Sequence, residues 1–454
     1  MSTLSQKQTV AGCDLPNVGV RPAPPVLSEQ EFEALMVRFG PFEQRPLLAV
    51  GLSGGADSTA LVLLAQTWAQ ARGGKVIALI VDHGLRDESA IEAQGVARSC
   101  QARGIDAEVL THRGSAVISG IEEAAREARH RLLGEACCRL GALHLLLAHH
   151  HGDQAETVAM RRQHGSTRHG LAGISGCVER VQFRVLRPLL ALPKDRLVAT
   201  LKWRGETWVE DPMNRDLRFA RARLRHHGVP EDPDQDAGNV RVELERALAQ
   251  ALPAIVGVDR FGVGRLDRTG WLALPSRLGL FALAHLAQTL GGLDYAPRGE
   301  RLEALAQRLR GDGPVSATLG RCQWKGTNQI TVVRERRHLP RLDVSETGPE
   351  LLWDGRFRVT LPAGTWFIRA LGDRAEGIDH TLLTTLPDFG LPIGAKAALP
   401  AIFGLEGLAC IPHLEWAVDA LAAGCRARFA PRQLLVGPMF VNASGAGAMD
   451  AENP

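Results

Sequence analysis

The sequence is poor in lysine and tyrosine. Only 6 of its 53 basic residues are lysines, and it has a single tyrosine among 454 residues. Because the remaining basic residues are arginines, the arginine count reflects composition, and only the placement of arginines is used here to predict phosphate contacts. The formal net charge of +3 is too small to identify a nucleic-acid-binding protein by itself.

Cysteine pairs and long apolar runs are also missing. The eight cysteines include no Cys-x-x-Cys pair, which excludes the usual zinc-finger and iron–sulfur spacings. Cys137 and Cys138 are adjacent in a predicted helix and point to different faces, so we do not expect them to pair. Scattered thiols are typical of the reducing cytoplasm. The N-terminus has no apolar segment behind basic residues, which predicts no signal peptide.

The most apolar stretch, residues 271–293, is interrupted by Pro275, Arg277 and His285. We therefore expect it to be a core helix and not a membrane span. Together with the cysteine pattern, this predicts a cytoplasmic protein without membrane contact.

Alternating apolar patterns predict the fold class. Predicted strands and predicted helices take turns from Pro46 onward, which favours an α/β fold with a doubly wound parallel sheet. Ligands of such sheets bind beyond the carboxyl ends of the strands. The predicted strands are 47–52, 76–81, 106–110 and 143–148, and the predicted helices are 59–71, 89–103, 121–140 and 153–163.

The chain is too long for one ordinary domain. We expect a leader at 1–45, a catalytic domain at 46–229, a mainly helical middle domain at 230–316, and a small mixed or β-rich C-terminal module at 317–454. Polar residues with Pro230 and Pro233 mark the end of the catalytic domain.

A glycine-rich turn, Ser53-Gly54-Gly55-Ala56-Asp57-Ser58, joins the first predicted strand to the first predicted helix. Backbone N–H groups and the helix dipole make such a turn a site for phosphate, and Asp57 is a candidate ligand for Mg²⁺ on the same phosphates. Gly-Lys-Ser/Thr is absent, so this is not the common P-loop. The turn resembles the ATP loop of the N-type ATP pyrophosphatases, which cleave ATP to an adenylated intermediate and pyrophosphate.

Two further constellations follow later strands. Asp82, His83 and Arg86 end the second strand, where they are candidates for nucleotide and phosphate contacts, although Asp-His-Gly is also a reasonable helix-capping turn. Arg126 and Arg129 share a helix face with Glu122. Spacing alone favours a solvated, salt-bridged face over phosphate contacts.

His150, Asp153 and Glu156 follow the fourth strand. Two carboxylates three residues apart at a helix start are able to bind a cation, either Mg²⁺ or an ammonium group. A neighbouring histidine is a candidate base or metal ligand. A zinc site is not predicted, because further ligands at regular spacing are not evident.

The ordered set of segments resembles the tRNA(Ile)-lysidine synthetase family, whose members attach free lysine to the wobble cytidine of an isoleucine tRNA. The resemblance is clearest over residues 47–225. Its segments are the ATP loop, Val81-Asp-His-Gly-Leu-Arg, Ile121-Glu-x-x-x-Arg-x-x-Arg, His150-x-x-Asp-Gln-x-Glu-Thr, Gly170-Leu-Ala-Gly, Arg187-Pro-Leu-Leu and Trp208-Val-Glu-Asp-Pro-x-Asn.

The resemblance implies a two-step reaction with ATP and Mg²⁺. Cytosine is adenylated at the carbonyl oxygen on carbon 2, and L-lysine then displaces AMP. It implies ATP contacts at Ser53–Ser58, Asp82 and His83, lysine recognition by Asp153 and Glu156, and proton handling by His150. The implied macromolecular partner is tRNA(Ile) with a CAU anticodon, with the C-terminal module in contact with it, and a homodimer is possible.

Arginines are candidates for the RNA contacts. If 215–227 is helical, Arg218, Arg221 and Arg225 share one face that is able to follow an RNA backbone. A solvated surface helix explains them about as well. Arg86, Arg126 and Arg129 complete the candidate phosphate contacts.

Three segments of the sequence depart from the family pattern. Gly152 stands where the family usually has aspartate, His164-Gly165-Ser166-Thr167 replaces an Arg-Gly-Ser-Gly loop, and His130 replaces an aromatic residue. Two alternatives therefore stay open: another tRNA-modifying enzyme of the superfamily, such as a thiolase, and a non-catalytic tRNA-binding relative.

Overall fold

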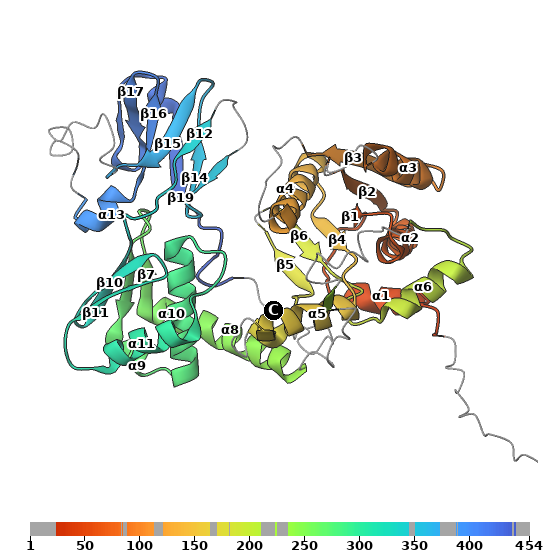
Figure 1. The fold of residues 1–454 in the computed structure, drawn as a ribbon, viewed down its shortest axis with the longest axis horizontal. Helices are drawn as coiled ribbons and strands as arrows, with labels where there is room; N and C mark the ends of the chain where they lie inside the picture. Colours follow the sequence, from red (N-terminus) through yellow and green to blue (C-terminus); the bar gives the residue numbers. More distant parts are fainter. Residues whose placement is uncertain are drawn as a thin grey trace, which may run out of the picture. The chain divides into compact units, whose positions relative to one another are not determined.

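A computed structural model describes residues 24–82, 84, 89–112, 121–163, 170–180, 182–209, 223–224, 235–344, 350–372, 387, 389–437 and 440–441 (Figure 1). The chain divides into two compact units. The first comprises residues 1–152 and 191–214, and the second comprises residues 153–190 and 215–454.

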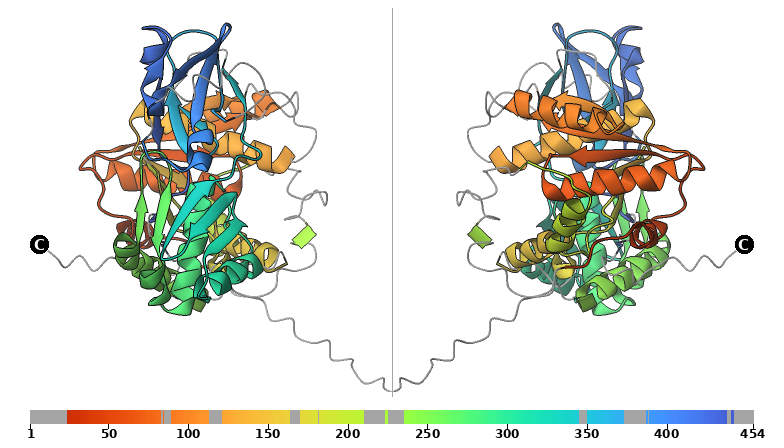
Figure 2. Two further views of the ribbon diagram at one scale, coloured as in Figure 1. Left: turned by 90° about the vertical axis from the view of Figure 1, so that its left-hand side faces the viewer. Right: turned by 90° about the vertical axis from the view of Figure 1, so that its right-hand side faces the viewer.

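Four parallel strands form the centre of the first unit. They are β1 (Leu47–Leu52), β2 (Lys75–Asp82), β3 (Asp106–Thr111) and β4 (His144–Leu147), hydrogen-bonded in the order β3-β2-β1-β4. Helices α2 (Ala56–Gln70), α3 (Ser89–Gln101) and α4 (Ile121–Leu140) connect them and lie on both faces of the strands (Figure 2). This confirms the predicted α/β class.

The strand order reverses beside β1. The chain runs from β1 outward to β2 and β3, and then returns to place β4 on the other side of β1. The carboxyl ends of β1 and β4 therefore flank a topological switch point, where open α/β sheets bind ligands. The Ser53–Ser58 loop follows β1, and His150 follows β4.

Part of the predicted leader belongs to the first unit. Helix α1 (Glu29–Val37) begins at Ser28, whose Oγ accepts a hydrogen bond from the Glu31 N–H at 3.1 Å. Phe32, Leu35 and Met36 are buried, and α1 packs against α2. Apolar residues at helical spacing explain this helix, so the compact unit begins before Pro46.

In the second unit, helices and strands share one core. Leu286 from a helix and Trp324 and Ile330 from strands are fully buried in the same cluster. The helices are α8 (Gln235–Ile255), α9 (Arg268–Leu272), α10 (Ser276–Gly291) and α11 (Gly299–Arg310). The sheet has the order β7-β8-β11-β10-β9 and comprises β7 (Val256–Val258), β8 (Gly264–Asp267), β9 (Val315–Leu319), β10 (Cys322–Gly326) and β11 (Gln329–Arg334).

The expected division at 316–317 therefore falls inside β9 and across this core. The middle region is mainly helical, as predicted, with the short strands β7 and β8 between its helices. These strands have three and four residues, too few to show an alternating pattern. β8 pairs with β11, which is distant in sequence.

The C-terminal part is β-rich, as the sequence predicts. One antiparallel sheet has the order β12-β15-β16-β17-β18, and a smaller one has the order β13-β14-β19. The strands are β12 (Leu342–Val344), β13 (Leu351–Trp353), β14 (Phe357–Thr360), β15 (Trp366–Ala370), β16 (Pro400–Gly404), β17 (Gly407–Ile411), β18 (Trp416–Ala417) and β19 (Arg426–Phe429). The short helix α13 (Ile393–Ala397) precedes β16.

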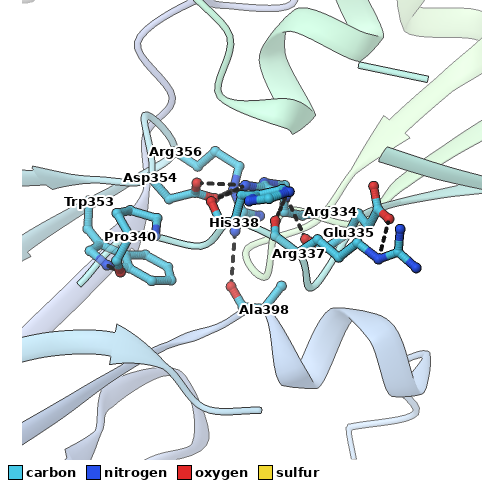
Figure 3. A network of polar contacts seen from close by, with 9 residues as sticks. All are labelled: Arg334, Glu335, Arg337, His338, Pro340, Trp353, Asp354, Arg356 and Ala398. Atoms are coloured by element: carbon cyan, nitrogen blue, oxygen red, sulfur yellow. Dashed lines mark hydrogen bonds and ion pairs between the residues drawn. The ribbon is translucent and has the colours of Figure 1, made fainter. Parts of the chain in front are cut away.

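A buried ionic network joins the two parts of the second unit (Figure 3). Arg334, at the end of β11, donates to both carboxylate oxygens of Asp354 at 3.1 Å. Arg356 donates to Asp354 Oδ2 at 2.7 Å and to the Ala398 carbonyl at 3.0 Å. The Asp354 carboxylate thus pairs with two guanidinium groups. Removal of Asp354 would leave two buried cations without their counter-ion, which is strongly destabilising.

The adjacent cysteines and the most apolar stretch of the sequence lie in helices α4 and α10. Cys137 is buried and Cys138 is exposed, and neither forms a disulfide bond. Residues 276–291 form the core helix α10. Within the described ranges, the helices include none that is long and apolar enough to cross a membrane.

Candidate active site

The loop between β1 and α2 is held in shape by its own serines. Ser58 Oγ accepts from the Ser53 N–H at 3.2 Å and donates to the Gly55 carbonyl at 3.0 Å. The two hydroxyl oxygens lie 3.1 Å apart. Gly55 is the residue before α2, and no side chain caps the first turn of that helix. The first N–H groups of α2 are thus available to an anion.

Glycine is required at position 54. Its φ of +82° lies in the left-handed region, and a Cβ there would lie 2.7 Å from Val96 Cγ2. The Gly54 carbonyl accepts from the Val209 N–H at 2.9 Å and from Thr59 Oγ1 at 3.3 Å. The Trp208-Val-Glu-Asp-Pro segment noted in the sequence therefore begins beside the ATP loop.

Asp57 lies in the first turn of α2 and has two unlike oxygens. Its Oδ2 is 3.4 Å from Lys194 Nζ and 3.7 Å from His150 Nε2. Its Oδ1 is buried and has no hydrogen-bond partner. A buried carboxylate oxygen without a partner is costly, so Oδ1 is suited to receive a cation.

The donor set fits Mg²⁺ held jointly by protein and substrate. Among the described residues, no group of three or more His, Cys, Asp or Glu side chains is placed to hold a metal ion by itself. Mg²⁺ commonly takes one or two carboxylates and completes its shell with substrate phosphates and water. Asp57 Oδ1 beside a phosphate-binding loop meets that requirement.

His150 is fixed by the backbone that follows it. Its Nδ1 accepts a hydrogen bond from the Gly152 N–H at 2.9 Å, so in the neutral ring Nε2 carries the proton. His150 is 7% exposed. A Cβ at Gly152 would lie 2.7 Å from His150 Cε1, so this glycine permits the ring position. With its Nδ1 lone pair engaged, His150 is poorly placed to accept a proton, and its Nε2 lies 3.7 Å from Asp57 Oδ2.

The Asp82 side chain stabilises the turn that follows β2. It is buried at the end of β2, and its Oδ1 accepts from the Gly84 N–H at 3.0 Å and from Ser89 Oγ at 2.6 Å. These bonds join the end of β2 to the start of α3, which supports the capping alternative for this residue. His83 and Arg86 lie outside the described residues.

The two candidate lysine-binding residues lie on α5 (His151–Gln163), which begins directly after His150. Glu156 is buried, with 2% of its surface exposed, and Asp153 is half-buried in the first turn. A separation of three residues places both on one helix face.

Gln154 connects α5 to the Gly170-Leu-Ala-Gly segment, which includes η1 (Gly170–Ala172). Its Oε1 accepts from the Ile174 N–H at 2.6 Å, and its Nε2 donates to the Ile174 carbonyl at 2.9 Å. Arg161, on the same helix, donates to the Gly173 carbonyl at 2.8 Å. Two segments that are separate in the sequence thus form one structural element.

The candidate phosphate-binding arginines are only partly described. On α4, Arg126 is exposed and Arg129 is half-buried, and burial lowers the pKa of Arg129. The side chain of Glu122 and the residues Arg86, Arg218, Arg221 and Arg225 lie outside the described part.

Lys194 is the residue at this site that the sequence reading missed. It is the first residue of α6 (Lys194–Trp203) and contacts Asp57. The sequence feature that could have identified Lys194 is its residue type, because it is one of only six lysines in an arginine-rich chain. It also follows the Arg187-Pro-Leu-Leu segment closely.

Comparisons with known proteins agree with this geometry. A family model described as a PP-loop domain matches residues 26–232, so the first part of the chain is a PP-loop ATP-binding domain. The chain is 34% identical over 390 residues to the tRNA(Ile)-lysidine synthase of Caulobacter vibrioides, an alignment that covers 84% of this chain and 89% of that protein. It is 43% identical over 287 residues to the same enzyme of Rhodopseudomonas palustris, with 60% and 82% covered. The chain belongs to the tRNA(Ile)-lysidine synthase family.

Among solved structures, the U34-tRNA thiolase NcsA of Methanococcus maripaludis with its iron–sulfur cluster is similar at a TM-score of 0.38 and 17% identity. That alignment covers 48% of this chain and 73% of the thiolase.

Proposed function

We propose that this chain uses ATP to ligate free L-lysine to carbon 2 of the wobble cytidine in tRNA(Ile) with a CAU anticodon. Family membership across most of the chain supports the reaction. The observation that carries the proposal is the loop before α2, which has a buried oxygen of Asp57 without a partner and an uncapped helix start.

In the first step, the cytidine oxygen on carbon 2 bonds to the α-phosphorus of ATP, and pyrophosphate leaves with the electron pair of the broken P–O bond. Ser53, Ser58 and the N–H groups at the start of α2 hold the phosphates. Asp57 Oδ1 is the proposed Mg²⁺ ligand. When bound, the ion neutralises phosphate charge.

In the second step, the lysine ε-amine bonds to carbon 2, and AMP leaves with the electrons of the C–O bond. Glu156 and Asp153 are the proposed ligands of the lysine ammonium groups. A buried carboxylate such as Glu156 discriminates strongly in favour of a charged partner. His150 Nε2 lies 3.7 Å from Asp57 Oδ2, and its Nδ1 accepts a proton only if the bond to Gly152 breaks.

The tRNA side of the proposal rests on fewer contacts. Arg126 is exposed on α4 and is a proposed phosphate contact. The proposed roles of Arg129, Arg86, Arg218, Arg221 and Arg225, the C-terminal contact with tRNA, a homodimer and a cytoplasmic location stay predictions.

ATP–pyrophosphate exchange tests the proposal against a non-catalytic tRNA-binding relative. Exchange is expected with tRNA(Ile) and without lysine, since adenylation precedes lysine attack. Elongator tRNA(Met), which carries the same anticodon letters, is the control. Absence of exchange with tRNA(Ile), in protein that binds this tRNA, would favour the non-catalytic alternative.

A further inference from the structure

Lys194 is a charged residue at the ATP loop to which the reaction described above assigns no role. Its Nζ lies 3.4 Å from Asp57 Oδ2, and 53% of its side chain is exposed, against 22% for Asp57. Helix α6, which begins with Lys194, packs against α2, which carries Asp57. The two side chains therefore come from packed helices of one unit, and their pairing does not depend on a long loop.

The ion pair and the proposed metal site share one carboxylate. Lys194 and His150 approach Asp57 Oδ2, whereas Oδ1 is buried without a partner. Lys194 thus supplies positive charge to the same carboxylate that Mg²⁺ would neutralise. A bound divalent cation and a lysine ammonium repel each other at such close range.

We propose that Lys194 is a catalytic residue that changes partners: it pairs with Asp57 before ATP and Mg²⁺ bind, and it then moves onto the substrate phosphates. The phosphates supply negative charge next to the loop at the moment when Asp57 is neutralised by the metal. The flexible four-carbon stem of lysine and the exposure of this side chain permit the movement while α6 stays in place.

The charge balance of adenylation gives the ammonium a role. The α-phosphorus gains a bond to the cytidine oxygen and loses its bond to the bridging oxygen, whose electron pair departs on pyrophosphate. A cation held on the β- and γ-phosphates stabilises that developing charge. This step rests on the proposed function, whereas the exchange between Asp57 and the phosphates requires only ATP binding.

Substitutions of Lys194 test its interaction with Asp57 and its proposed interaction with the phosphates separately. Lys194→Met removes the charge and keeps most of the stem, and Lys194→Arg keeps the charge. Lys202→Met is the matched control, because Lys202 is an exposed lysine on the same helix. The full-length protein is first titrated with Mg²⁺ alone and followed by thermal unfolding. Binding of ATP with Mg²⁺ is then measured by calorimetry.

Lys194→Met is expected to strengthen the binding of Mg²⁺ alone and to weaken the binding of ATP with Mg²⁺. In Lys194→Met, the Mg²⁺ concentration for half-maximal stabilisation falls about two- to five-fold, since an ion pair this exposed contributes at most about 1 kcal/mol. The affinity for ATP with Mg²⁺ falls, and the rate of pyrophosphate release falls by ~10². Lys194→Arg and Lys202→Met stay near the wild type in the Mg²⁺ titration.

Shifts of the same sign in both titrations, or an unchanged Mg²⁺ titration, would contradict the proposed exchange of partners by Lys194. If Lys194 had a purely structural role, its removal would not strengthen Mg²⁺ binding. The two proposals fail separately. If the wild type releases no pyrophosphate with tRNA(Ile) but the opposite shifts are observed, the proposed reaction fails and the role of Lys194 at Asp57 stands.

Discussion

Gln154 and Ile174 are joined by two hydrogen bonds that imitate a strand pair. The side-chain amide of Gln154 accepts from the Ile174 N–H at 2.6 Å and donates to the Ile174 carbonyl at 2.9 Å. Gly173, with φ of +78°, lies so close that a Cβ would collide with Gln154 Oε1. The glutamine next to the candidate lysine-binding residues thus has a structural role.

Gln154→Leu should lower the free energy of unfolding by about 1–3 kcal/mol, because two backbone groups lose their partners. Gly173→Ala should destabilise as well, through both strain and collision. Urea unfolding measures both. Gln163→Ala, at the exposed end of the same helix, is the control and should stay within about 0.5 kcal/mol of the wild type. A Gln154 variant as stable as this control would show that the two bonds contribute little.

Gly152→Ala should turn the His150 ring away from Asp57, since the added Cβ would lie 2.7 Å from Cε1. Loss of the bond to Nδ1 corresponds to at most a roughly ten-fold fall in pyrophosphate release. Nitrogen chemical shifts of the His150 ring, measured by NMR, report the lost acceptor bond directly.

Gly95→Ala, on α3, where an added Cβ would meet only the Arg98 side chain at 4.0 Å, controls for a general effect of removing a glycine. Unchanged ring shifts together with an unchanged rate in Gly152→Ala would mean that the identity of residue 152 does not govern His150.

Glu156→Gln should impair the use of lysine much more than adenylation. The buried carboxylate is proposed to pair with an ammonium group, and loss of one partner of such a pair costs roughly 2–5 kcal/mol. The KM for lysine and the rate of pyrophosphate release without lysine are measured separately. Equal losses in both would assign Glu156 to folding or to the metal instead.

Low pH should destabilise the second unit through His413. Burial, together with Arg260 and Arg356, lowers the pKa of His413 to about 4. The unfolded side chain binds a proton below about pH 6.5, whereas the folded one stays neutral until about pH 4. Its contribution is therefore complete above pH 6.5 and is lost as the pH falls toward 4.

Between pH 7.5 and 5.5, His413 should account for about 1 kcal/mol of lost stability in urea unfolding. His413→Gln should reduce this pH dependence by that amount, although its stability at pH 7.5 will also change. His338→Asn is the control, since His338 is exposed and its removal should leave the slope as it is. A His413 variant with the wild-type slope would contradict the assignment.

The sequence predicted best where a pattern is local. The loop after β1 lies where the sequence predicted it. Because both faces of β1 are covered, the strand is a continuous apolar run that is easily recognised, and the glycine turn marks its end. The sequence predicted poorly where pairing is distant, as for β8 against β11. The ion pair of Lys194 with Asp57 and the bonds of Gln154 to Ile174 join residues from separate elements, so no spacing rule reveals them.

Asp57→Asn should reduce adenylation by ~10²–10³ and leave tRNA binding nearly intact, because it removes a metal carboxylate from a loop whose shape depends on Ser53 and Ser58. Pyrophosphate release measures the first effect and filter binding of tRNA the second. Near-normal pyrophosphate release in this variant would remove the assignment of the ATP loop.

The most direct test of the proposed reaction is nucleoside mass analysis of tRNA(Ile) after incubation with the full-length protein, ATP and Mg²⁺, with and without L-lysine. With lysine, we predict that the wobble cytidine is converted to lysidine and that AMP and pyrophosphate are released. Without lysine, only pyrophosphate should be released. An unmodified cytidine in the presence of all substrates, with protein that binds both ATP and this tRNA, would contradict the account.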